Sequence, residues 1–503
     1  SSGGVIQLFT EDAPDTPEIG STVMFGSYNT KRQVINAAGI ADGVEYLLNA
    51  SNFESDGYRD NSESDKQQAT AKFKFNISDD TKITTLINWF DQEAQDPIGL
   101  DRARAFNSST RDDVVPAALN ANTSVSRSHT QVGFNFEHAF NENNKLSFIP
   151  YVGTRKNAQI LTTTALATAP TGPGGTSTNA CNTTNGTCAR LSEIDREFYG
   201  TDARWDNSGN LGSMPYNLSF GLTYGKSIDD RLDTNILNNG FNVNETNSRE
   251  ENISTNFDPY AQGKLAVLPS VDLHAGIRRT KVRLEVKDDF TSGVGSNGNN
   301  SGSVSYEKTT PVFGATWKVS PSVNLYANYG KGFETPTFIE AAFNTTAANA
   351  TPNLSLKPSK SENFEIGAKT FLSDNTQANL TLFHIKTNDE IVTNQTLAGR
   401  STFANANSTK RTGAEFSLDS DFDYGISTFF SYSLLNAKFD SDFTPTGGTI
   451  IQSGNRIPGT YRSQIYGEIA WQYEPVGFMM ALEGRHNSKV YVNDRNTDTA
   501  PSY

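Results

Sequence analysis

Short turns and long polar stretches alternate along this chain, and runs of period-two hydrophobicity connect them. Residues 69–77 read ATAKFKFNI, so Ala, Phe and Ile alternate with Thr, Lys and Asn. This alternation is typical of a β-strand with one apolar and one polar face. The turn Ser78-Asp79-Asp80 and a second alternating run, TKITTLINWF, follow directly. Together the two runs predict a β-hairpin.

Similar hairpins recur along the chain, for example QVGFNFEHAF and KLSFIPYVG joined by NENN. After the second strand of each hairpin comes a long polar stretch, at residues 91–127, 156–192, 227–256, 286–304, 331–362, 387–409 and 438–460. Strands of about ten residues with tight turns at one end and long loops at the other are typical of a transmembrane antiparallel β-barrel. We therefore predict an all-β fold with about nineteen strands, the last being GFMMALEGR. Because such barrels usually have an even number of strands, we expect the C-terminal strands to be missing.

The composition supports this fold, although it is unusually polar. Only 35% of residues are hydrophobic and the mean hydropathy is -0.52, yet 11% of residues are aromatic. A barrel accounts for both values, because only the lipid-facing half of each strand must be apolar while the lumen and loops meet water. No apolar run approaches the length that a membrane-spanning helix needs, so a helical membrane protein is excluded.

Charge and cysteine content restrict the function further. The net charge of -14 argues against binding nucleic acid. The two cysteines, Cys181 and Cys188, lie in STNACNTTNGTCARL, and their spacing fits neither a redox motif nor a zinc site. We predict a small loop disulfide, which would place the chain in an oxidising compartment, with two unpaired thiols as the alternative. The start SSGGVIQLFT has no signal peptide, so we expect a fragment or a mature form.

Three stretches carry a resemblance to a known family. The start SSGGVIQLFTEDAPDTPEIGSTVMFGSYNTKR is similar to the end of the plug domain and first barrel strand of TonB-dependent outer-membrane receptors. LLNASNFESDGYRDNS resembles the third strand and second loop of that family. YANYGKGFETPTFIEA followed by NLSLKPSKSENFEIGAK resembles its strand, loop and LKPE-type linker, with Ser359 where the family usually has Glu. In this stretch we expect Gly330, Gly332 and Pro336 to release the chain from the sheet.

The resemblance implies a barrel of the 22-stranded type whose lumen is closed by a plug. Residues 1–16 would be the C-terminal remnant of the plug domain and residues 17–503 the barrel domain. The chain would lie in the bacterial outer membrane, in contact with its lipid. It would import a ferric siderophore or similar iron chelate, with energy from the inner-membrane TonB complex, whose contact segment would precede this sequence. A TonB-dependent receptor for cobalamin or an oligosaccharide is the alternative.

The residues that we expect to bind an anionic ferric chelate are arginines and an aromatic residue in the loops, because guanidinium groups grip carboxylates in a bidentate manner. The candidates are Arg102, Arg104, Phe106, Arg190, Arg400 and Arg456. Each arginine has the alternative of pairing with loop acids or lipid headgroups, and a neutral or cationic ligand remains open. The sequence shows no catalytic motif, cofactor motif or metal-ligand cluster, and its five histidines are scattered. We predict that the chain is not an enzyme.

Two other architectures remain as alternatives. A passive porin would have fewer strands, typically 16 to 18, and no plug remnant such as GGVIQLFT. A soluble propeller or lectin would show repeats of fixed length, whereas the polar stretches here are very unequal. Recovery of the full-length protein with outer membranes, as a species with heat-modifiable gel mobility, distinguishes the barrel from the soluble alternatives.

Overall fold

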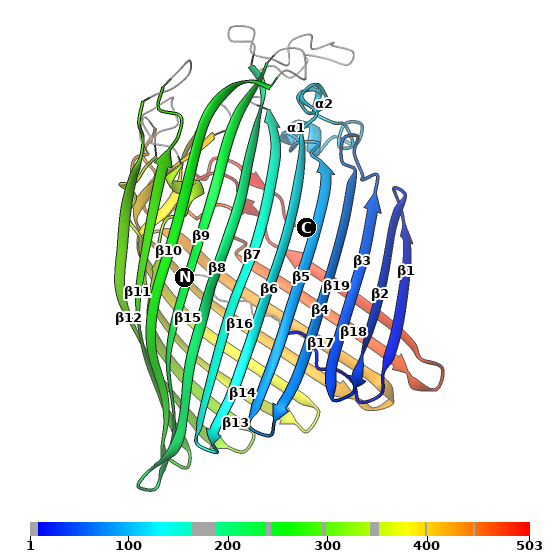
Figure 1. Ribbon diagram of the computed structural model, residues 1–503, viewed down its shortest axis with the longest axis vertical. Coiled ribbons are helices and arrows are strands. Elements are labelled where there is room, and N and C mark those ends of the chain that lie inside the picture. Colours follow the sequence, from blue (N-terminus) through cyan, green and yellow to red (C-terminus); the bar gives the residue numbers. More distant parts are fainter. Residues whose placement is uncertain are drawn as a thin grey trace.

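The computed structural model describes residues 9–162, 187–237, 243–292, 298–342, 352–397, 400–445 and 448–503. Its main feature is a 19-stranded antiparallel sheet in which each strand pairs with the next along the chain (Figure 1). The strands are β1 (Glu18–Gly26), β2 (Thr30–Ala41), β3 (Val44–Ser55), β4 (Ser64–Ser78), β5 (Thr81–Gln95), β6 (Ser124–Asn141), β7 (Asn144–Thr162), β8 (Thr187–Leu211), β9 (Met214–Leu237), β10 (Val243–Leu268), β11 (Val271–Asp288), β12 (Gly302–Ser320), β13 (Val323–Glu334), β14 (Ser359–Ser373), β15 (Thr376–Leu397), β16 (Arg400–Phe422), β17 (Ile426–Phe439), β18 (Ser463–Tyr473) and β19 (Phe478–Asn487).

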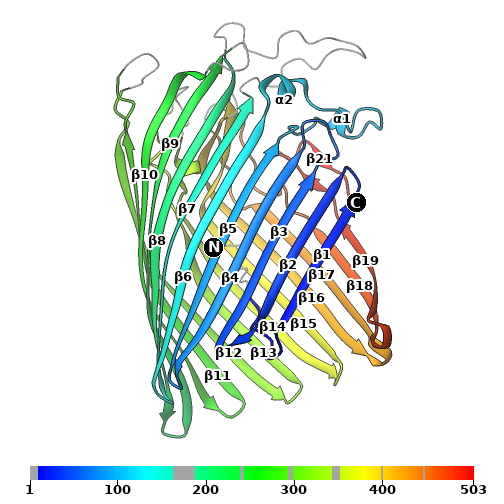
Figure 2. The ribbon, with the colours of Figure 1, turned by 45° about the vertical axis from the view of Figure 1, so that its right-hand side comes forward.

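The sheet curls into a barrel wall, with the later strands passing behind the earlier ones in both ribbon views (Figures 1 and 2). Among the described residues, no strand pairing joins β1 to β19, so the wall is open there. The predicted all-β antiparallel sheet of about nineteen strands is confirmed, and β19 contains the predicted last strand GFMMALEGR except for its first residue, Gly477, which lies in the preceding turn. No described helix is long and apolar enough to cross a membrane.

The long connections all lie at the end of the strands opposite to the two-residue turns, as the sequence predicts, although residues 27–29 also form a short turn at that end. The end with tight turns, here the inner end, includes the two-residue turns at 42–43, 79–80, 142–143, 212–213, 269–270, 321–322 and 374–375. Two 3-10 turns, η1 (Asp423–Gly425) and η2 (Glu474–Val476), also close this end. The opposite end, here the outer end, holds the long connections and the short helices α1 (Arg102–Ala105), α2 (Pro116–Ala121) and α3 (Phe338–Ala341). A two-stranded ribbon, β20 (Val490–Tyr491) and β21 (Thr499–Ala500), follows β19.

Several strands are much longer than the predicted ten residues. Strands β8, β9 and β10 contain 25, 24 and 26 residues. The expectation that residues 227–256 and 387–409 are mainly loops was wrong, because β9 and β10 continue to Leu237 and Val243, and β15 and β16 continue to Leu397 and Arg400. About ten residues suffice to cross the hydrocarbon layer. Beyond it both faces of a strand meet water, so the hydrophobic alternation that marks a strand disappears.

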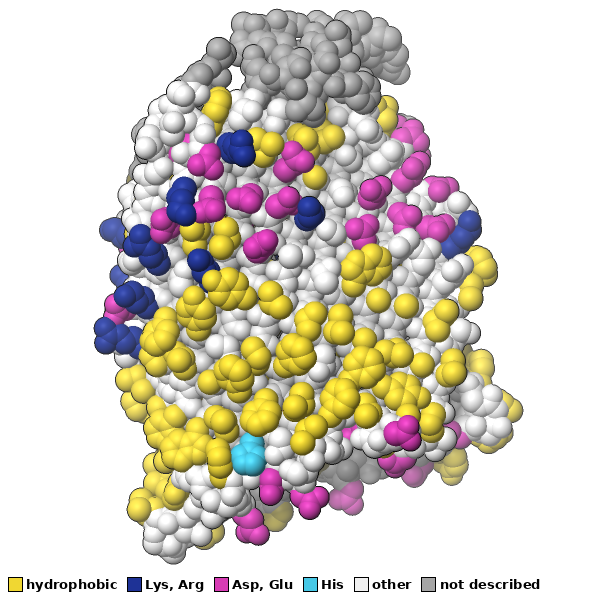
Figure 3. Space-filling model, viewed as in Figure 1, with side chains coloured by type: hydrophobic (Ala, Val, Ile, Leu, Met, Phe, Trp, Pro, Cys, Tyr) yellow, Lys and Arg dark blue, Asp and Glu magenta, His cyan; other side chains and the backbone are white. Residues whose placement is uncertain are grey.

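The strand register separates an apolar outer surface from a polar lumen. Ile87 on β5 lies opposite Ala71 on β4 and Val132 on β6, which puts three apolar side chains on the outer surface. On the face seen in Figure 3, the result is a band of hydrophobic side chains across the inner half of the wall, with charged side chains above and below it. Lipid hydrocarbon is the medium that such a belt fits. The predicted apolar and polar faces of residues 69–77 are confirmed by this register.

The apparent break in alternation at Leu382 and Phe383 has a structural reason. Leu382 lies on the outer surface, opposite Ile366 and Ala414. Phe383 points to the lumen, where its ring occupies the place that a side chain at Gly413 would fill. Aromatic residues commonly cover a glycine on the neighbouring strand in this way. Phe383 can therefore be apolar although it faces the lumen, and the register of the strand does not change.

The stretch GKGFETPTFIE departs from the expected loop. Gly330 and Gly332 remain in the ladder opposite Asn363 and Ser361, and pairing continues to Glu334. The expectation that these two glycines release the chain was therefore wrong, since glycine weakens a strand but keeps its N–H donor. Pro336 follows the end of β13, and Thr337 then caps α3 in a capping box with Glu340.

The described N-terminal segment, residues 9–17, contacts the lumen face of the wall. The Lys72 ammonium group on β4 donates to the carbonyl oxygen of Glu11 at 2.7 Å and to the carboxylate of Asp12 at 3.1 Å. The assignment of residues 1–16 to a plug remnant stays a prediction, and residues 1–8 lie outside the described part of the chain.

Candidate ligand-binding site

Arg102 and Phe106 lie together at the outer end, around the short helix α1 after β5. The Arg102 guanidinium lies 5.9 Å from the centre of the Phe106 ring. It also forms an ion pair with Asp498 and donates to the carbonyl oxygen of Thr499 at 2.9 Å. The acid that engages Arg102 is therefore part of the segment after β19. Of the alternatives considered for Arg102, the structure therefore shows an ion pair with a loop acid.

Arg104 and Arg190 are largely enclosed by protein. The Arg104 side chain is 17% exposed and lies 3.9 Å from Asp101, the residue that caps α1. Arg190, near the outer end of β8, has a lowered pKa because burial disfavours its charge, although Asp233 opposes this effect. Among the described residues, no hydrogen bond, ion pair or ring contact joins Arg102 or Arg104 to Arg190.

The other two predicted ligand-binding residues, Arg400 and Arg456, lie on other elements of the barrel. Arg456 lies opposite Lys438 in an isolated bridge beside the outer end of β17. The backbone of Arg400 begins β16, but its side chain lies outside the described part of the structure. Residue Cys181 and the side chain of Cys188 also lie outside it, so the disulfide stays a prediction. The structure therefore does not gather the six predicted residues into one site.

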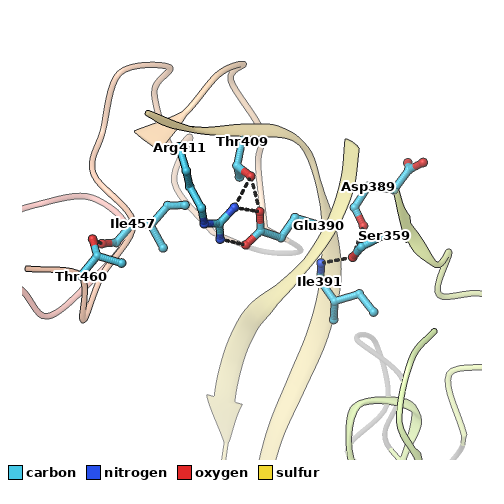
Figure 4. Close-up of polar contacts among 8 residues, drawn as sticks. All are labelled: Ser359, Asp389, Glu390, Ile391, Thr409, Arg411, Ile457 and Thr460. Atoms are coloured by element: carbon cyan, nitrogen blue, oxygen red, sulfur yellow. Dashed lines mark hydrogen bonds and ion pairs between the residues drawn. The ribbon is translucent and has the colours of Figure 1, made fainter. Parts of the chain in front are cut away.

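A further arginine at the outer end is neutralised by a carboxylate (Figure 4). The Arg411 guanidinium donates to both oxygens of Glu390, at 2.6 and 3.0 Å, and Thr409 adds a third hydrogen bond to the same carboxylate. Both members of this ion pair are 16% exposed. The hydroxyl of Ser359, the residue at the linker position, bonds to backbone groups of Asp389 and Ile391 and so fastens the start of β14 to β15.

Replacing Glu390 with Gln is expected to loosen the outer ends of β15 and β16. Arg411 would keep its charge in a largely buried position without a carboxylate, which costs about 1–3 kcal/mol. Hydrogen exchange of the full-length protein should become faster in residues 387–411 and stay unchanged in the apolar belt. The control is Glu415→Gln, an exposed residue on β16, the strand that carries Arg411. Equal exchange in both variants would contradict the assigned role of Glu390.

A different group of side chains converges on the lumen face of β6 to β10. The register places His129 opposite Arg155, Arg155 opposite Arg196, and Arg196 opposite Asp229. His129, Arg155 and Arg196 line a cavity of 370 Å³, together with Gln131, Tyr151, Phe198, Gly225, Lys226, Ser227, Ser254 and Asn256. We call this set the lumen site. It combines cationic, aromatic and amide side chains from five strands.

The aromatic residues of the lumen site lie on glycines of the neighbouring strands. The Phe198 ring fills the space beside Gly153, and the Tyr151 ring and hydroxyl fill the space beside Gly200. The His129 ring stacks on Phe198 with centroids 5.6 Å apart and an angle of 8° between their planes, and Tyr151 adds a tilted contact at 6.3 Å. Because Gly153 and Gly200 have no side chain, the Phe198 and Tyr151 rings can lie directly against the strand backbone.

The two arginines of the lumen site differ in their partners. Arg196 donates to both carboxylate oxygens of Asp229, each at 2.6 Å, so its charge is matched. Arg155 is exposed to the lumen, and among the described residues no acid or hydrogen-bond acceptor engages its guanidinium. An unpaired guanidinium beside aromatic faces suits a ligand with carboxylate or other anionic oxygen atoms.

The sequence prediction missed the lumen site because it considered only loops. Arg155 and Arg196 lie within strands and are 41 positions apart in the sequence, and only the register makes them neighbours. A signal was nevertheless present, because Tyr151, Arg155, Arg196 and Phe198 occupy the face of each strand that is otherwise polar. Aromatic residues at such positions need a packing partner or a ligand. Among the described residues, no three His, Cys, Asp or Glu side chains are grouped so as to hold a metal ion.

Comparison with known proteins establishes the family. Residues 47–503 match the family model of the TonB dependent receptor-like β-barrel. Among similar solved structures, the ferric citrate transporter FecA is 16% identical with a TM-score of 0.74, and the match covers 97% of this chain and 69% of FecA. The siderophore receptor PiuA from Acinetobacter baumannii is 16% identical with a TM-score of 0.76, covering 98% of this chain and 75% of PiuA. The copper transporter OprC is 13% identical with a TM-score of 0.72, covering 99% of this chain and 73% of OprC.

These structural neighbours are similar in fold, and the family match extends over most of the chain. Proteins of this family are transport receptors and not enzymes, and their barrels lie in the outer membrane. The chain is a β-barrel that belongs to the TonB-dependent receptor family.

Proposed function

We propose that this barrel belongs to an outer-membrane receptor that takes up a ferric siderophore or a similar anionic iron chelate, driven by the TonB complex. The main supporting observation is the Arg155 guanidinium, which has no partner among the described residues and shares a lumen cavity with the His129, Phe198 and Tyr151 rings. FecA and PiuA, which share the fold, are a ferric citrate transporter and a siderophore receptor.

In this proposal the ligand crosses the lumen along the polar faces of β6 to β10. Arg155 would bind anionic oxygen atoms of the chelate, and the aromatic rings would contact its flat or apolar parts. Arg196, held by both oxygens of Asp229, would keep Arg155 from pairing with that acid. Passage of the chelate through the lumen requires no covalent bond to form or break. The residues of the lumen site therefore need only bind, orient and release the chelate.

Replacing Arg155 with Ala is expected to raise the half-saturation concentration for chelate uptake by about 10- to 100-fold, because a hydrogen bond to a charged group contributes about 1.5–3 kcal/mol. Uptake of radioactive iron by cells that carry the full-length receptor measures this, with ferric citrate and a panel of ferric siderophores as ligands. The maximal rate should change little, because Arg155 does not touch the energy-coupling partner in this proposal.

The matched control is Arg279→Ala, since Arg279 lies on the outer surface and pairs with Glu307. Uptake by the control should equal that of the wild type. An unchanged half-saturation concentration in Arg155→Ala for every ferric chelate would remove the lumen site from the proposal. Transport of only cobalamin or an oligosaccharide would overturn the iron assignment while leaving the family unchanged.

A further inference from the structure

Basic residues form a row on the outer surface of the barrel, across the outer ends of β15, β16 and β17. The register places Lys386 opposite Lys410 and Lys410 opposite Lys438, and Lys438 is bridged to Arg456. We call these four residues the basic row. Residues that are directly opposite in antiparallel strands project to the same face. Leu382 and Leu434, an even number of positions along the same strands, share that face and belong to the apolar belt.

The basic row therefore lies just outside the hydrocarbon belt. From Lys438 toward the inner end of β17, the next residues on this face are Asn436 and then Leu434. These four strand residues span about 13 Å, which is the distance along the strand from the Leu434 side chain to the cations. This is the level at which lipid headgroups begin.

The charges of the basic row are only partly matched. Asp440 pairs with Lys410 at 2.6 Å and with Lys386 at 3.7 Å. Among the described residues, no acid forms an ion pair with Lys438, Arg456 or the nearby Arg462. Like charges directly opposite each other in a sheet are destabilising. The Lys438 and Arg456 pair is thus a place where an external anion would add stability.

Hydrogen bonds hold the Arg456 guanidinium in a fixed position on the outer surface of the barrel. Its guanidinium donates to the carbonyl oxygen of Leu435 at 3.1 Å and to the side-chain oxygen of Asn436 at 3.5 Å. Burial lowers the pKa of Arg456, and the positive charge of Arg462 lowers it further. The next residue, Ile457, packs in the opposite direction against the buried cluster around Phe439. The guanidinium is therefore positioned before any ligand binds.

A cavity of 650 Å³ lies at the end of the basic row formed by Lys438 and Arg456. Ala414 and Leu434 from the apolar belt line its inner side, and Lys438, Arg456, Arg462 and Tyr491 line its outer side. The cavity thus has an apolar part continuous with the belt and a cationic part at headgroup level. This combination suits an amphiphile with an acyl chain and a phosphate group.

We propose that this cavity binds a phosphate group of an anionic glycolipid from the outer leaflet of the membrane. The phosphate would contact Lys438, Arg456 and Arg462, and an acyl chain would run past Leu434 and Ala414. The site faces away from the lumen, so the lipid is a bound component of the membrane and not the transported ligand. The proposal is independent of which nutrient the receptor carries.

Native mass spectrometry of the full-length receptor in mild detergent tests the proposal, with diphosphorylated lipid A and its dephosphorylated form as probes. The double variant Arg456→Gln and Arg462→Gln should bind the phosphorylated lipid about 30-fold more weakly, since each basic residue near the surface contributes about 1 kcal/mol. The control, Arg485→Gln with Arg495→Gln, removes two charges from exposed positions that do not line the cavity and should bind like the wild type.

Equal binding of the two lipids by the wild type, or equal loss in the control, would overturn the proposal. Complete displacement of the lipid by millimolar inorganic phosphate would instead identify a free-anion site and would also overturn it. If the double variant does not fold into a heat-modifiable barrel, Lys438→Gln alone replaces it, because this single change leaves the backbone contacts of Arg456 intact. Unchanged affinity in that variant would then reject the site.

Discussion

Replacing Leu380 with Arg is expected to destabilise the folded barrel strongly in a bilayer. Leu380 lies on the outer surface of β15, opposite Ala368 and Phe416 within the apolar belt. It is four residues from the start of the strand, or about 13 Å along it, which places it near the middle of an apolar band about 25 Å tall. An Arg on the lipid face at this depth costs about 2–4 kcal/mol.

The control for this substitution is the preceding residue. Asn379 points to the lumen, where it donates to the hydroxyl of Ser417 at 3.2 Å. An Arg at position 379 would reach water, so Asn379→Arg should keep most of the wild-type stability. Urea titration of the full-length protein folded into lipid vesicles measures both free energies of unfolding. Equal losses at positions 379 and 380 would show that the assigned faces of β15 are wrong.

Replacing Gly200 with Ala is expected to destabilise the wall and also to disrupt the lumen site. A methyl group at Gly200 would meet the Tyr151 ring and the carbonyl oxygen of Tyr224. The carbonyl belongs to the strand ladder and cannot move freely, so the tyrosine and both strands must shift. Overpacking of this kind typically costs about 1–3 kcal/mol. Ligand affinity should fall as well, because Tyr151 supports the Phe198 ring.

Gly467→Ala is the matched control, because nothing lies close to a methyl group at that position of β18. It should leave both the unfolding temperature and ligand uptake unchanged. The double variant Tyr151→Ala with Gly200→Ala should recover part of the lost stability, since removal of the ring opens space, but it should not recover ligand affinity. Full stability in Gly200→Ala alone would contradict the packing described for the lumen site.

Local sequence patterns were sufficient to predict the architecture. The turn predicted at Ser78-Asp79-Asp80 and the period-two run of β4 depend only on residues that are close in the sequence, and both are confirmed except that Ser78 still belongs to β4. The extent of the strands was harder to predict. Above the membrane both faces of β9 and β10 meet water, so residues such as Asp230 and Glu251 pair in the ladder without any hydrophobic alternation.

The candidate site could not be predicted from local patterns. Arg155 becomes a neighbour of Arg196 only through the register of β7 and β8, and Phe198 reaches Gly153 only across the same pair of strands. The loop arginines were chosen by residue type, and the structure shows that Arg102 pairs with Asp498 at the far end of the chain. Partners so distant in sequence leave no local signal.

Energy-dependent uptake tests the central claim most directly. Cells that carry the full-length receptor would be given ferric chelates at increasing concentration, with and without a functional TonB protein. The account predicts saturable accumulation of iron from at least one chelate, and this accumulation should stop when TonB is absent. Uptake that rises linearly with concentration and is unaffected by loss of TonB would identify a passive pore and contradict the account.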